Sequence, residues 1–440
     1  MTTDPTMALA SYVHQMSYDD LPQTAIANAK LALLDTIGVM FAGSEHKVGR
    51  MIADYVRASG ATGPASILAT EIRTAPEFAA LANGILAHAL DYDDHGHAST
   101  QSLPAALALG EARNASGKQL LLAYIIGREV CFQLTRCLDS GGWEGSGPQG
   151  RGWHSVGITG AMGATAAAAK MLDLDPPTIC TALGITVSLT GGVFANRGTM
   201  TKPLHAGNAA RSAVLASTLA SKGFTADETI LTSSGGFADV YGVPQGVAAA
   251  AVDRLRQHLH IVEHGIGVKR YPSCSPTHGY INAMRLLKEK HRLTPEQVES
   301  IACSPSRSLR CLYPKTDLEA KFSAAFSLVA TLIDGEVNLR NCTEAFLRRA
   351  DVQALLAKTV YLEQASGPER LLRVKTVHGE VYEQALIRPK DITDPDEIRR
   401  KYYDSTNSAT GEARARRIEA AVDDLEKLDD IGRLTDLLRS

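Results

Sequence analysis

The chain lacks a strong charge of either sign, long apolar runs and a high aromatic content. Its formal net charge is −3 over 440 residues and no dense basic run occurs, which argues against a nucleic-acid-binding surface. The longest apolar runs, such as residues 184–195, are too short and too rich in glycine to span a bilayer. Aromatic residues make up only 5% while alanine and glycine are abundant, so closely packed helices are favoured over an aromatic-rich β-sandwich.

Paired cysteines and a leader segment are also missing. The seven cysteines are scattered without a C-x-x-C pair, so neither a disulfide framework nor a zinc knuckle is predicted. Residues 1–5 show no basic stretch that leads into an apolar core, so no signal peptide is predicted. We therefore expect reduced thiols and a cytoplasmic protein, with neither a nucleic acid nor a membrane as its partner.

The composition present is that of an ordinary globular protein, 45% hydrophobic and 21% charged, with enough apolar residues for a sizeable core. Apolar residues at three- and four-residue spacing predict helices through most of the first 260 residues. These predicted helices cover residues 25–39, 75–89, 105–112, 119–134, 160–172 and 206–222.

The pattern changes near residue 262. Residues 262–271 predict an extended segment, and residues 371–387 predict a two-stranded hairpin around a His378-Gly379 turn. Residues 294–297 form a capping box with proline at the first helical position. The other predicted elements are helices over 278–291 and 319–333, a strand over 300–303, and charged helices from residue 394 onward.

We infer from this order a mainly α fold. A large all-helical domain comprises residues 1–264 and 391–440, and a smaller α+β lid domain, residues 265–390, is inserted into it.

The densest group of chemically active side chains is DYDDHGH at residues 91–97. Three carboxylates and two imidazoles follow a helix-like apolar segment there, an arrangement suited to acid–base chemistry and equally compatible with a hydrated helix end. Consecutive ligands on one short loop are not expected to converge on a metal, and no second ligand pair of familiar spacing exists, so no metal site is predicted.

Three further stretches combine Gly, His and Lys. His154 precedes a predicted helix start, where backbone amides favour an anion. Lys202 precedes a proline and is expected on extended backbone at the entry of the next helix, close to His205. Lys269 and Arg270 adjoin the proposed domain boundary, where clefts form, and His278 follows at a helix start. Dinucleotide, P-loop, G-x-S-x-G and H-E-x-x-H signatures are absent from the sequence.

Taken in order, these stretches resemble the MmgE/PrpD family, whose members include dehydratases, decarboxylases and an epimerase of small carboxylic acids. The matching motifs are HALDYDD at 88–94, HAS with LPA at 97–105, WH at 153–154, MTKPLHAG at 200–207, KRYP at 269–272 and EAKFS at 319–323. Any one of them is weak, but six in the right order are specific. They span more than half of the chain.

The resemblance implies a helical domain with an α+β lid, a homodimer, and an active site between the domains that needs no metal or organic cofactor. It implies Asp91, His97, His154, Lys202 and Lys269 as catalytic residues. Residues expected to bind substrate are Asp94, His95, His205, Arg270 and His278.

The sequence departs from the family pattern in two places. His95 stands where the decarboxylases carry a threonine, in a segment that looks shorter than theirs. Phe326 stands where the family offers a tyrosine toward the site, and a phenylalanine cannot transfer a proton.

We therefore predict a cofactor-independent lyase that removes water or CO2 from a small di- or tricarboxylate. In the expected mechanism the lysines hold carboxylates, a histidine moves the proton, Asp91 orients a histidine, and crowded cations lower the pKa of a Lys or His. The alternatives are an epimerase of a dicarboxylate such as iminodisuccinate, which the missing tyrosine and extra His95 allow, and a non-catalytic homodimeric binding protein.

Overall fold

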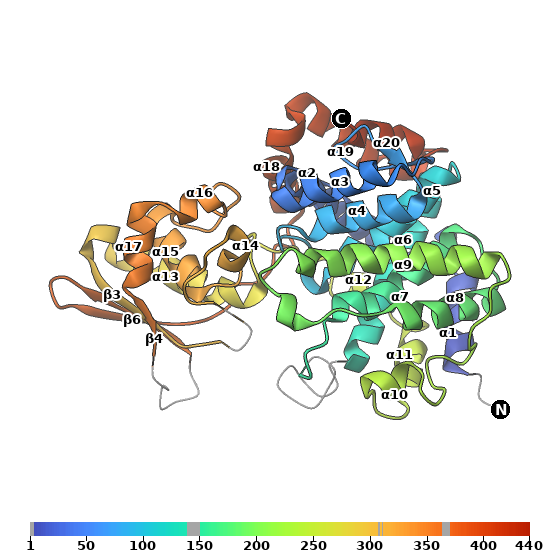
Figure 1. The fold of residues 1–440 in the computed structure, drawn as a ribbon, viewed down its shortest axis with the longest axis horizontal. Helices are drawn as coiled ribbons and strands as arrows, with labels where there is room; N and C mark the ends of the chain where they lie inside the picture. The colour runs from blue at the N-terminus through green and yellow to red at the C-terminus, as the bar shows by residue number, and fades with distance from the viewer. Residues whose placement is uncertain (1–3, 139–149, 307–308, 310, 363–369) are drawn as a thin grey trace.

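The computed structural model describes residues 4–138, 150–306, 309, 311–362 and 370–440. The fold is mainly α, with a large helical body and a smaller part that carries a four-stranded sheet (Figure 1). The helices of the body before the smaller part are α1 Pro5–Gln15, α2 Gln23–Glu45, α3 Lys47–Ser59, α4 Pro76–His88, α5 Ser99–Ala112, α6 Gly117–Leu138, α7 Thr159–Met171, α8 Pro176–Leu189, α9 Thr201–Ser221, α10 Phe237–Tyr241, α11 Val247–Leu255 and α12 His260–Glu263. Two short strands, β1 Ala65–Ser66 and β2 Arg73–Thr74, pair in the same body.

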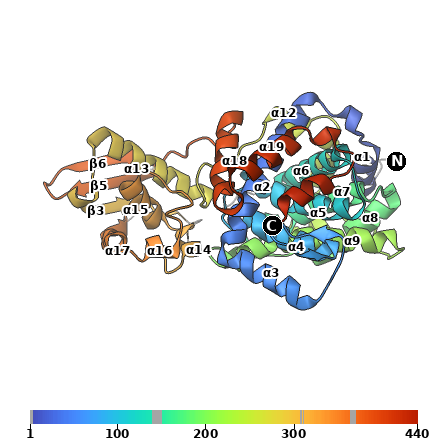
Figure 2. The same ribbon diagram turned by 90° about the horizontal axis from the view of Figure 1, so that it is seen from above.

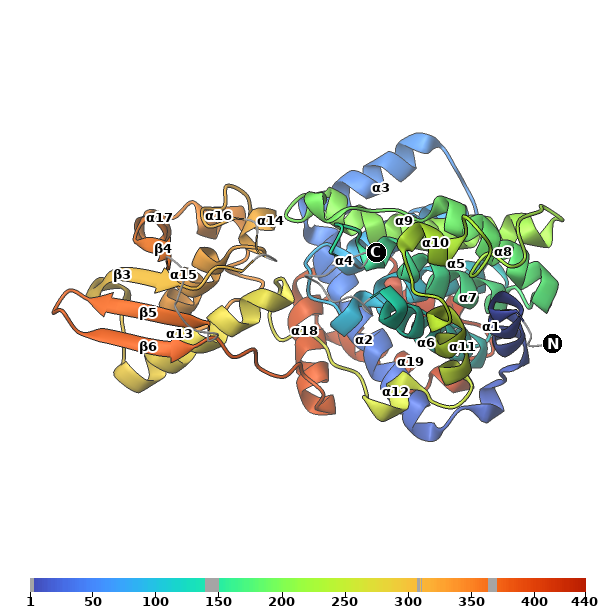
Figure 3. The same cartoon turned by 90° about the horizontal axis from the view of Figure 1, so that it is seen from below.

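The smaller part, called the lid below, lies to one side of the body in Figure 1. Its elements are α13 His278–His291, β3 Val298–Cys303, α14 Asp317–Ala320, α15 Ala324–Asp334, α16 Glu344–Leu347, α17 Ala350–Ala357, β4 Thr359–Tyr361, β5 Leu371–Thr376 and β6 Val381–Ala385. The chain then returns to the body as α18 Pro395–Thr410, α19 Glu412–Asp423 and α20 Gly432–Leu438. Helix α18 lies beside α2 at the side of the body that faces the lid (Figures 2 and 3).

The lid sheet has the strand order β4-β3-β5-β6. Strands β3 and β4 are parallel, whereas β3, β5 and β6 pair antiparallel in a meander-like order. In β5, Leu372 and Val374 are fully buried while Arg373 between them is exposed, the alternation expected of a sheet with one covered face.

Each part has its own hydrophobic core. The core of the body includes residues up to Val268 and takes in Ile392 and the buried side chains of the last three helices. A separate core begins at Tyr271 and is confined to the lid. The chain therefore crosses between the two cores near residues 269–270, next to two of the predicted site residues.

Small residues let the helices of the body approach closely. A Cβ added at Gly84 of α4 would lie 2.8 Å from the Cα of Gly207 in α9, and one added at Gly207 would lie 2.3 Å from the carbonyl oxygen of Leu81. This close contact holds the end of α4, from which the 91–97 loop departs, against the beginning of α9.

Most predicted elements are confirmed, and the 278–291 helix has the predicted bounds. The hairpin and the capping box of Thr294 and Gln297 are present, although the capped element is a single 3-10 turn. Residues 262–271 contain the end of α12 and irregular backbone, in which Val268 makes isolated bridges to Asp94 and Ile392.

Three local predictions are wrong, and in each case the cause lies at the start of a helix. Helix α5 begins at Ser99 instead of after Pro104, because the Asp94 carboxylate accepts hydrogen bonds from the backbone and hydroxyl of Ser99. The predicted 319–333 helix is two helices, because the hydroxyl of Ser323 accepts the Phe326 N–H and starts α15 anew. Lys202 lies in the first turn of α9 and not on extended backbone, since a proline at the third helical position is tolerated there.

By length and composition, α2 could cross a membrane, but 78% of its apolar window is buried within the body, where it packs as a core helix.

We expect Gly207→Ala to lower the free energy of unfolding by about 1–3 kcal/mol despite the better helix propensity of alanine, because its methyl group would meet backbone that cannot move away. Urea unfolding measures this change. Asn208→Ala, the neighbouring and only partly buried position, is the control and should shift stability by less than about 0.5 kcal/mol. Equal stability of the two variants would contradict the close-packing interpretation.

Candidate active site

A cavity of about 680 Å³ is lined by residues of both the body and the lid. The body contributes the 91–97 loop, His154 and the beginning of α9, and the lid contributes Tyr280 and Phe322. Asp91 is the only carboxylate among the described lining residues. The lining cations are Arg136, Arg197, Lys202, Lys269, Arg370 and Arg388. A cavity with this excess of positive charge is suited to a small, multiply charged acid.

The 91–97 loop has unusual backbone at both ends. Asp91 and His97 have positive φ values of 51° and 64°, and Gly96 between them has φ 78°. A Cβ at Gly96 would lie 2.7 Å from the ring of Phe132, so glycine is required there for space as well as conformation. A residue other than glycine pays conformational energy to adopt this left-handed backbone conformation, and it keeps the conformation where the surrounding structure holds it.

Two ammonium groups converge on the carboxylate of Asp91. Lys202 Nζ lies 3.0 Å from Asp91 Oδ1, and Lys269 forms an ion pair with the same oxygen. Lys269 Nζ also donates to the Asp91 carbonyl at 3.0 Å. All three residues are buried, so each charge depends on the others for the solvation that water would otherwise supply.

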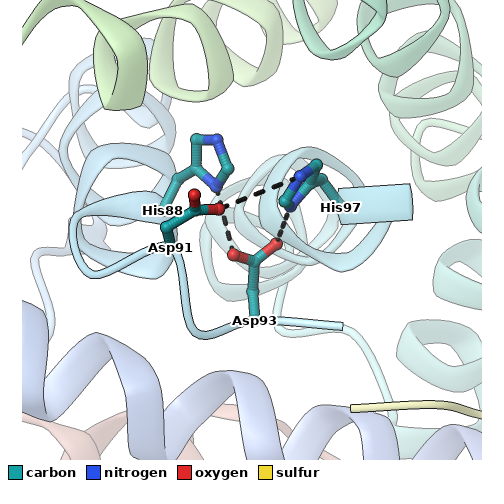
Figure 4. A group of neighbouring side chains, drawn as sticks. All are labelled: His88, Asp91, Asp93 and His97. Carbon is teal, nitrogen blue, oxygen red and sulfur yellow. Dashed lines mark hydrogen bonds and ion pairs between the residues drawn. The ribbon is translucent and has the colours of Figure 1, made fainter. Parts of the chain in front are cut away.

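A second carboxylate, Asp93, holds two imidazoles (Figure 4). His97 Nδ1 lies 2.6 Å from one oxygen of Asp93, and His88 Nδ1 lies 3.1 Å from the other. On its far side, His88 Nε2 lies 3.0 Å from Lys202 Nζ. An ammonium can only donate, so Nε2 of His88 accepts from Lys202 and Nδ1–H donates to Asp93. In the same way Asp93 holds the proton of His97 on Nδ1 and leaves Nε2 for chemistry.

His154 and His205 form a second imidazole pair, with 2.9 Å between their Nδ1 atoms. The His154 ring lies 6.2 Å from the ring of His88, which in turn lies 4.5 Å from the ring of His97. The backbone N–H of His154 donates to the carbonyl of Gly192, which fixes the strand-like entry to α7. His154 lines the cavity, whereas His205 contacts His154 and is not among the lining residues.

The pKa shifts follow from burial and from this charge pattern. Burial opposes ionisation of both carboxylates, but Lys202 and Lys269 hold the pKa of Asp91 well below its usual range, and His97 and His88 do the same for Asp93. Burial and the charge of Lys202 lower the pKa of His88 to about 3 and that of His205 to about 4.

The same causes lower the pKa of His154 well below its usual value, so this imidazole is neutral at pH 7. Burial also opposes the charge on Lys269, but Asp91 outweighs it and raises the pKa of Lys269. The expected lowering of a pKa by crowded cations therefore occurs at imidazoles and not at Lys269.

The residues predicted as catalytic all line the cavity: Asp91, His97, His154, Lys202 and Lys269. The sequence predicts that Asp91 orients a histidine, and its carboxylate does lie 4.0 Å from His97 Nε2. Asp91 lies closer to Lys202, at 3.0 Å, whereas the short contacts to His88 and His97 are made by Asp93.

Of the predicted substrate-binding residues, only His95 lines the cavity, where it contacts Asp391 and Arg388. Asp94 instead forms a buried ion pair with Arg128, and Arg270 pairs with Glu397. His278 is fully buried against the Tyr271 ring, beyond the lining residues.

Several site residues were not selected from the sequence. His88 and Asp93 lie within the HALDYDD motif, and their spacing from His97 was the available signal. The lining arginines come from separate elements, and nothing in their local sequence marks them.

Phe326, which replaces the expected tyrosine, lies in the lid core with its ring 6.1 Å from that of Phe346. It is 1% exposed and is not among the residues that line the cavity. The substitution therefore removes no group from the described cavity.

The consecutive residues of the acidic loop do not all converge, since Asp94 pairs with Arg128 and His95 with Asp391, but part of the loop does form a cluster. Ligand atoms of His88, Asp91, Asp93 and His97 lie within 4.8 Å of one another. A metal ion nevertheless fits these four residues poorly. Lys202 and Lys269 already bind the Asp91 carboxylate, and Lys202 also contacts the His88 imidazole.

The lowered pKa of His88 predicts a pH-dependent stability. The unfolded imidazole binds a proton near pH 6.5 and the folded one only near pH 3, so stability present above about pH 6.5 is lost as the pH falls toward 3. Between pH 4.5 and 6, His88→Gln should reduce the slope of unfolding free energy against pH by about 1 kcal/mol per unit. Urea unfolding at several pH values tests this. His378→Gln in the exposed turn is the control, and an unchanged slope in the His88 variant would contradict the assignment.

The chain was also compared with known proteins. Residues 7–249 match the model of the MmgE/PrpD N-terminal domain, and residues 271–427 match that of the MmgE/PrpD C-terminal domain. The chain is 29% identical to the cis-aconitate decarboxylase of Mus musculus over 377 residues, covering 81% of this chain and 75% of the mouse protein.

Two further relatives bear the same name. The human cis-aconitate decarboxylase is 27% identical over 86% of this chain and 79% of its own length. The Aspergillus terreus enzyme is 24% identical over 98% of this chain and 95% of its own length. The two domain matches together extend over most of the chain, and the chain belongs to the MmgE/PrpD family.

Proposed function

We propose that this protein is a cofactor-independent lyase that removes CO2 from a small unsaturated tricarboxylate, with cis-aconitate as the first substrate to test. The observation that carries the proposal is the convergence of two buried ammonium groups on one carboxylate, beside paired imidazoles, in a cavity that both parts of the chain line. The names of the relatives support the same chemistry.

The lysines meet the main electrostatic demand of such a reaction. When a C–C bond to a carboxylate breaks, CO2 leaves and its electron pair moves into a carbon skeleton that is already anionic. Fixed positive charges stabilise this developing charge most effectively in a site with little water. Lys202 and Lys269 share the carboxylate of Asp91, and Asp93 adds a second negative charge just outside the lining. The positive charge available to the substrate therefore comes from these lysines together with the four lining arginines.

The imidazoles meet the need for a proton. The electron pair left by CO2 is quenched by one proton on carbon, so the site requires a positioned donor that solvent can refill. His97 presents Nε2 because Asp93 holds Nδ1, so Nε2 first takes up a proton from solvent and then delivers that proton to carbon, returning to the neutral ring. The pKa of His154 is lowered well below its usual value, so this imidazole is a weak base and lines the cavity as a neutral hydrogen-bonding group.

Lys202→Met should lower kcat/KM for cis-aconitate by about 10³-fold or more, because the variant keeps the side-chain length but removes the charge that stabilises the transition state. Proton NMR in D2O follows the reaction, and the circular dichroism spectrum should be unchanged. Lys222→Met, at the exposed end of the same helix, is the control and should leave kcat/KM unaltered. Wild-type activity should survive EDTA.

The same NMR experiment separates the competing functions. A decarboxylase gives CO2 and a new alkene that carries one deuterium, and a dehydratase converts a hydroxy acid by loss of water. An epimerase exchanges one C–H and inverts that carbon, and a binding protein leaves every acid unchanged. Any of the last three outcomes, or full activity in the Lys202 variant, would overturn the proposal. The predicted homodimer is tested on the same sample by light scattering.

Phe326→Tyr should leave kcat within about twofold of wild type, because the ring lies in the lid core and outside the cavity lining. The added hydroxyl would enter the apolar lid core, where an unpaired buried hydroxyl costs about 1–3 kcal/mol of stability. Thermal unfolding and steady-state kinetics measure the two effects. A large gain in activity would show that the missing phenol matters for catalysis.

A further inference from the structure

A buried ion pair lies beneath the 91–97 loop and takes no part in the proposed chemistry. Lys401 Nζ of α18 lies 2.8 Å from Asp35 Oδ1 of α2. The two residues are 3% and 1% exposed. A buried pair of this kind contributes little net stability compared with apolar residues of similar volume, so its presence next to the site calls for another explanation.

The Lys401 ammonium is bound on three sides. Besides Asp35, it donates to the carbonyl oxygen of Tyr92 at 2.5 Å and lies 4.0 Å from the centre of the Tyr92 ring. Its contacts are thus a carboxylate, a carbonyl and an aromatic face, all favourable for a cation. Two of the three belong to a loop residue that lies between Asp91 and Asp93.

The loop backbone is held at three consecutive carbonyls. The carbonyl of Asp91 accepts from Lys269 Nζ, that of Tyr92 from Lys401 Nζ, and that of Asp93 from the backbone N–H of Lys269. The Tyr92 carbonyl belongs to the peptide that links Tyr92 to Asp93. Turning this peptide would rotate the Asp93 carboxylate away from His88 and His97.

This anchoring matters because the loop is strained. Asp91 has a φ of 51°, a conformation that a non-glycine residue leaves unless its surroundings hold it. Lys269 anchors the loop from the segment that enters the lid, whereas Lys401 anchors it from the helix that returns from the lid.

We propose that Lys401 and Asp35 are a positioning pair: Asp35 holds the Lys401 ammonium in place, and the ammonium fixes the Tyr92 peptide and so the directions of Asp91 and Asp93. The pair touches neither substrate nor reacting atoms. Its activity readouts rest on the proposed lyase function, but its structural readout does not.

The test compares a single with a double substitution. Lys401→Met leaves Asp35 buried without its partner and should lower Tm by roughly 5 °C or more, with loss of activity. The Asp35→Leu/Lys401→Met double variant removes both charges and keeps side chains of similar length and branching, so its Tm should return to within about 3 °C of wild type. Its kcat should nevertheless stay about 10- to 100-fold low, with KM within about threefold, because the Tyr92 peptide has lost its anchor.

A partly exposed ion pair that also includes a residue of α2 serves as the control. Lys30 of α2 forms an ion pair with Glu426 away from the cavity. The Glu426→Leu/Lys30→Met double variant should keep both Tm and kcat near wild type. A purely structural role for Lys401 predicts that the two double variants behave alike, and that result would overturn the proposal.

A readout without substrate separates this inference from the proposed function. The imidazole Nδ1–H proton of His97 is hydrogen-bonded to Asp93 and should give a downfield proton NMR resonance, assigned by its loss in His97→Gln. We expect this resonance to shift or vanish in Asp35→Leu/Lys401→Met and to persist in the control. Suppose that the wild-type protein turns over no acid, but the His97 resonance shifts or vanishes in Asp35→Leu/Lys401→Met and persists in the control. The lyase proposal then fails and the positioning pair stands. An unchanged resonance in the Asp35→Leu/Lys401→Met variant would reject the positioning pair.

Discussion

The site depends on one carboxylate that is shared by two buried ammonium groups. Asp91, Lys202 and Lys269 are nearly inaccessible to solvent, and none of the three charges could be buried alone without a large desolvation cost. Their mutual neutralisation brings the loop after α4, the first turn of α9 and the segment that enters the lid to one point. The cavity exists where these three segments meet.

The two neighbouring carboxylates of the loop have different partners and therefore different consequences. Asp91 contacts two ammonium groups and raises the pKa of Lys269. Asp93 contacts imidazoles and sets which ring nitrogen carries the proton. Lys202 links the two arrangements through His88, so the cationic and proton-transfer parts of the site are one hydrogen-bonded unit. A change at any member is expected to be felt at the others.

Local sequence patterns predicted the elements well where capping and periodicity agreed, as in the 278–291 helix and the β5–β6 hairpin. They failed where a local side-chain hydrogen bond started a helix at a residue that the apolar periodicity does not mark. Asp94 starts α5 earlier than the Pro104 pattern indicates, and Ser323 divides one predicted helix into two. The motifs identified five residues that line the cavity, but they did not single out Asp93, which makes the short contacts to two histidines.

The sequence by itself determined the helical body with its α+β lid, the family, and the loop and lysines around which the site is built, because these follow from periodicity and from motifs that are local in the chain. Only the tertiary structure decided which carboxylate faces lysine and which faces histidine, that Phe326 lies in the lid core, and that Lys401 supports the loop from about 300 residues away. The physical reason is that partners of buried charges are chosen by proximity in the folded chain, where desolvation makes every unpaired group costly, and no local pattern encodes that proximity.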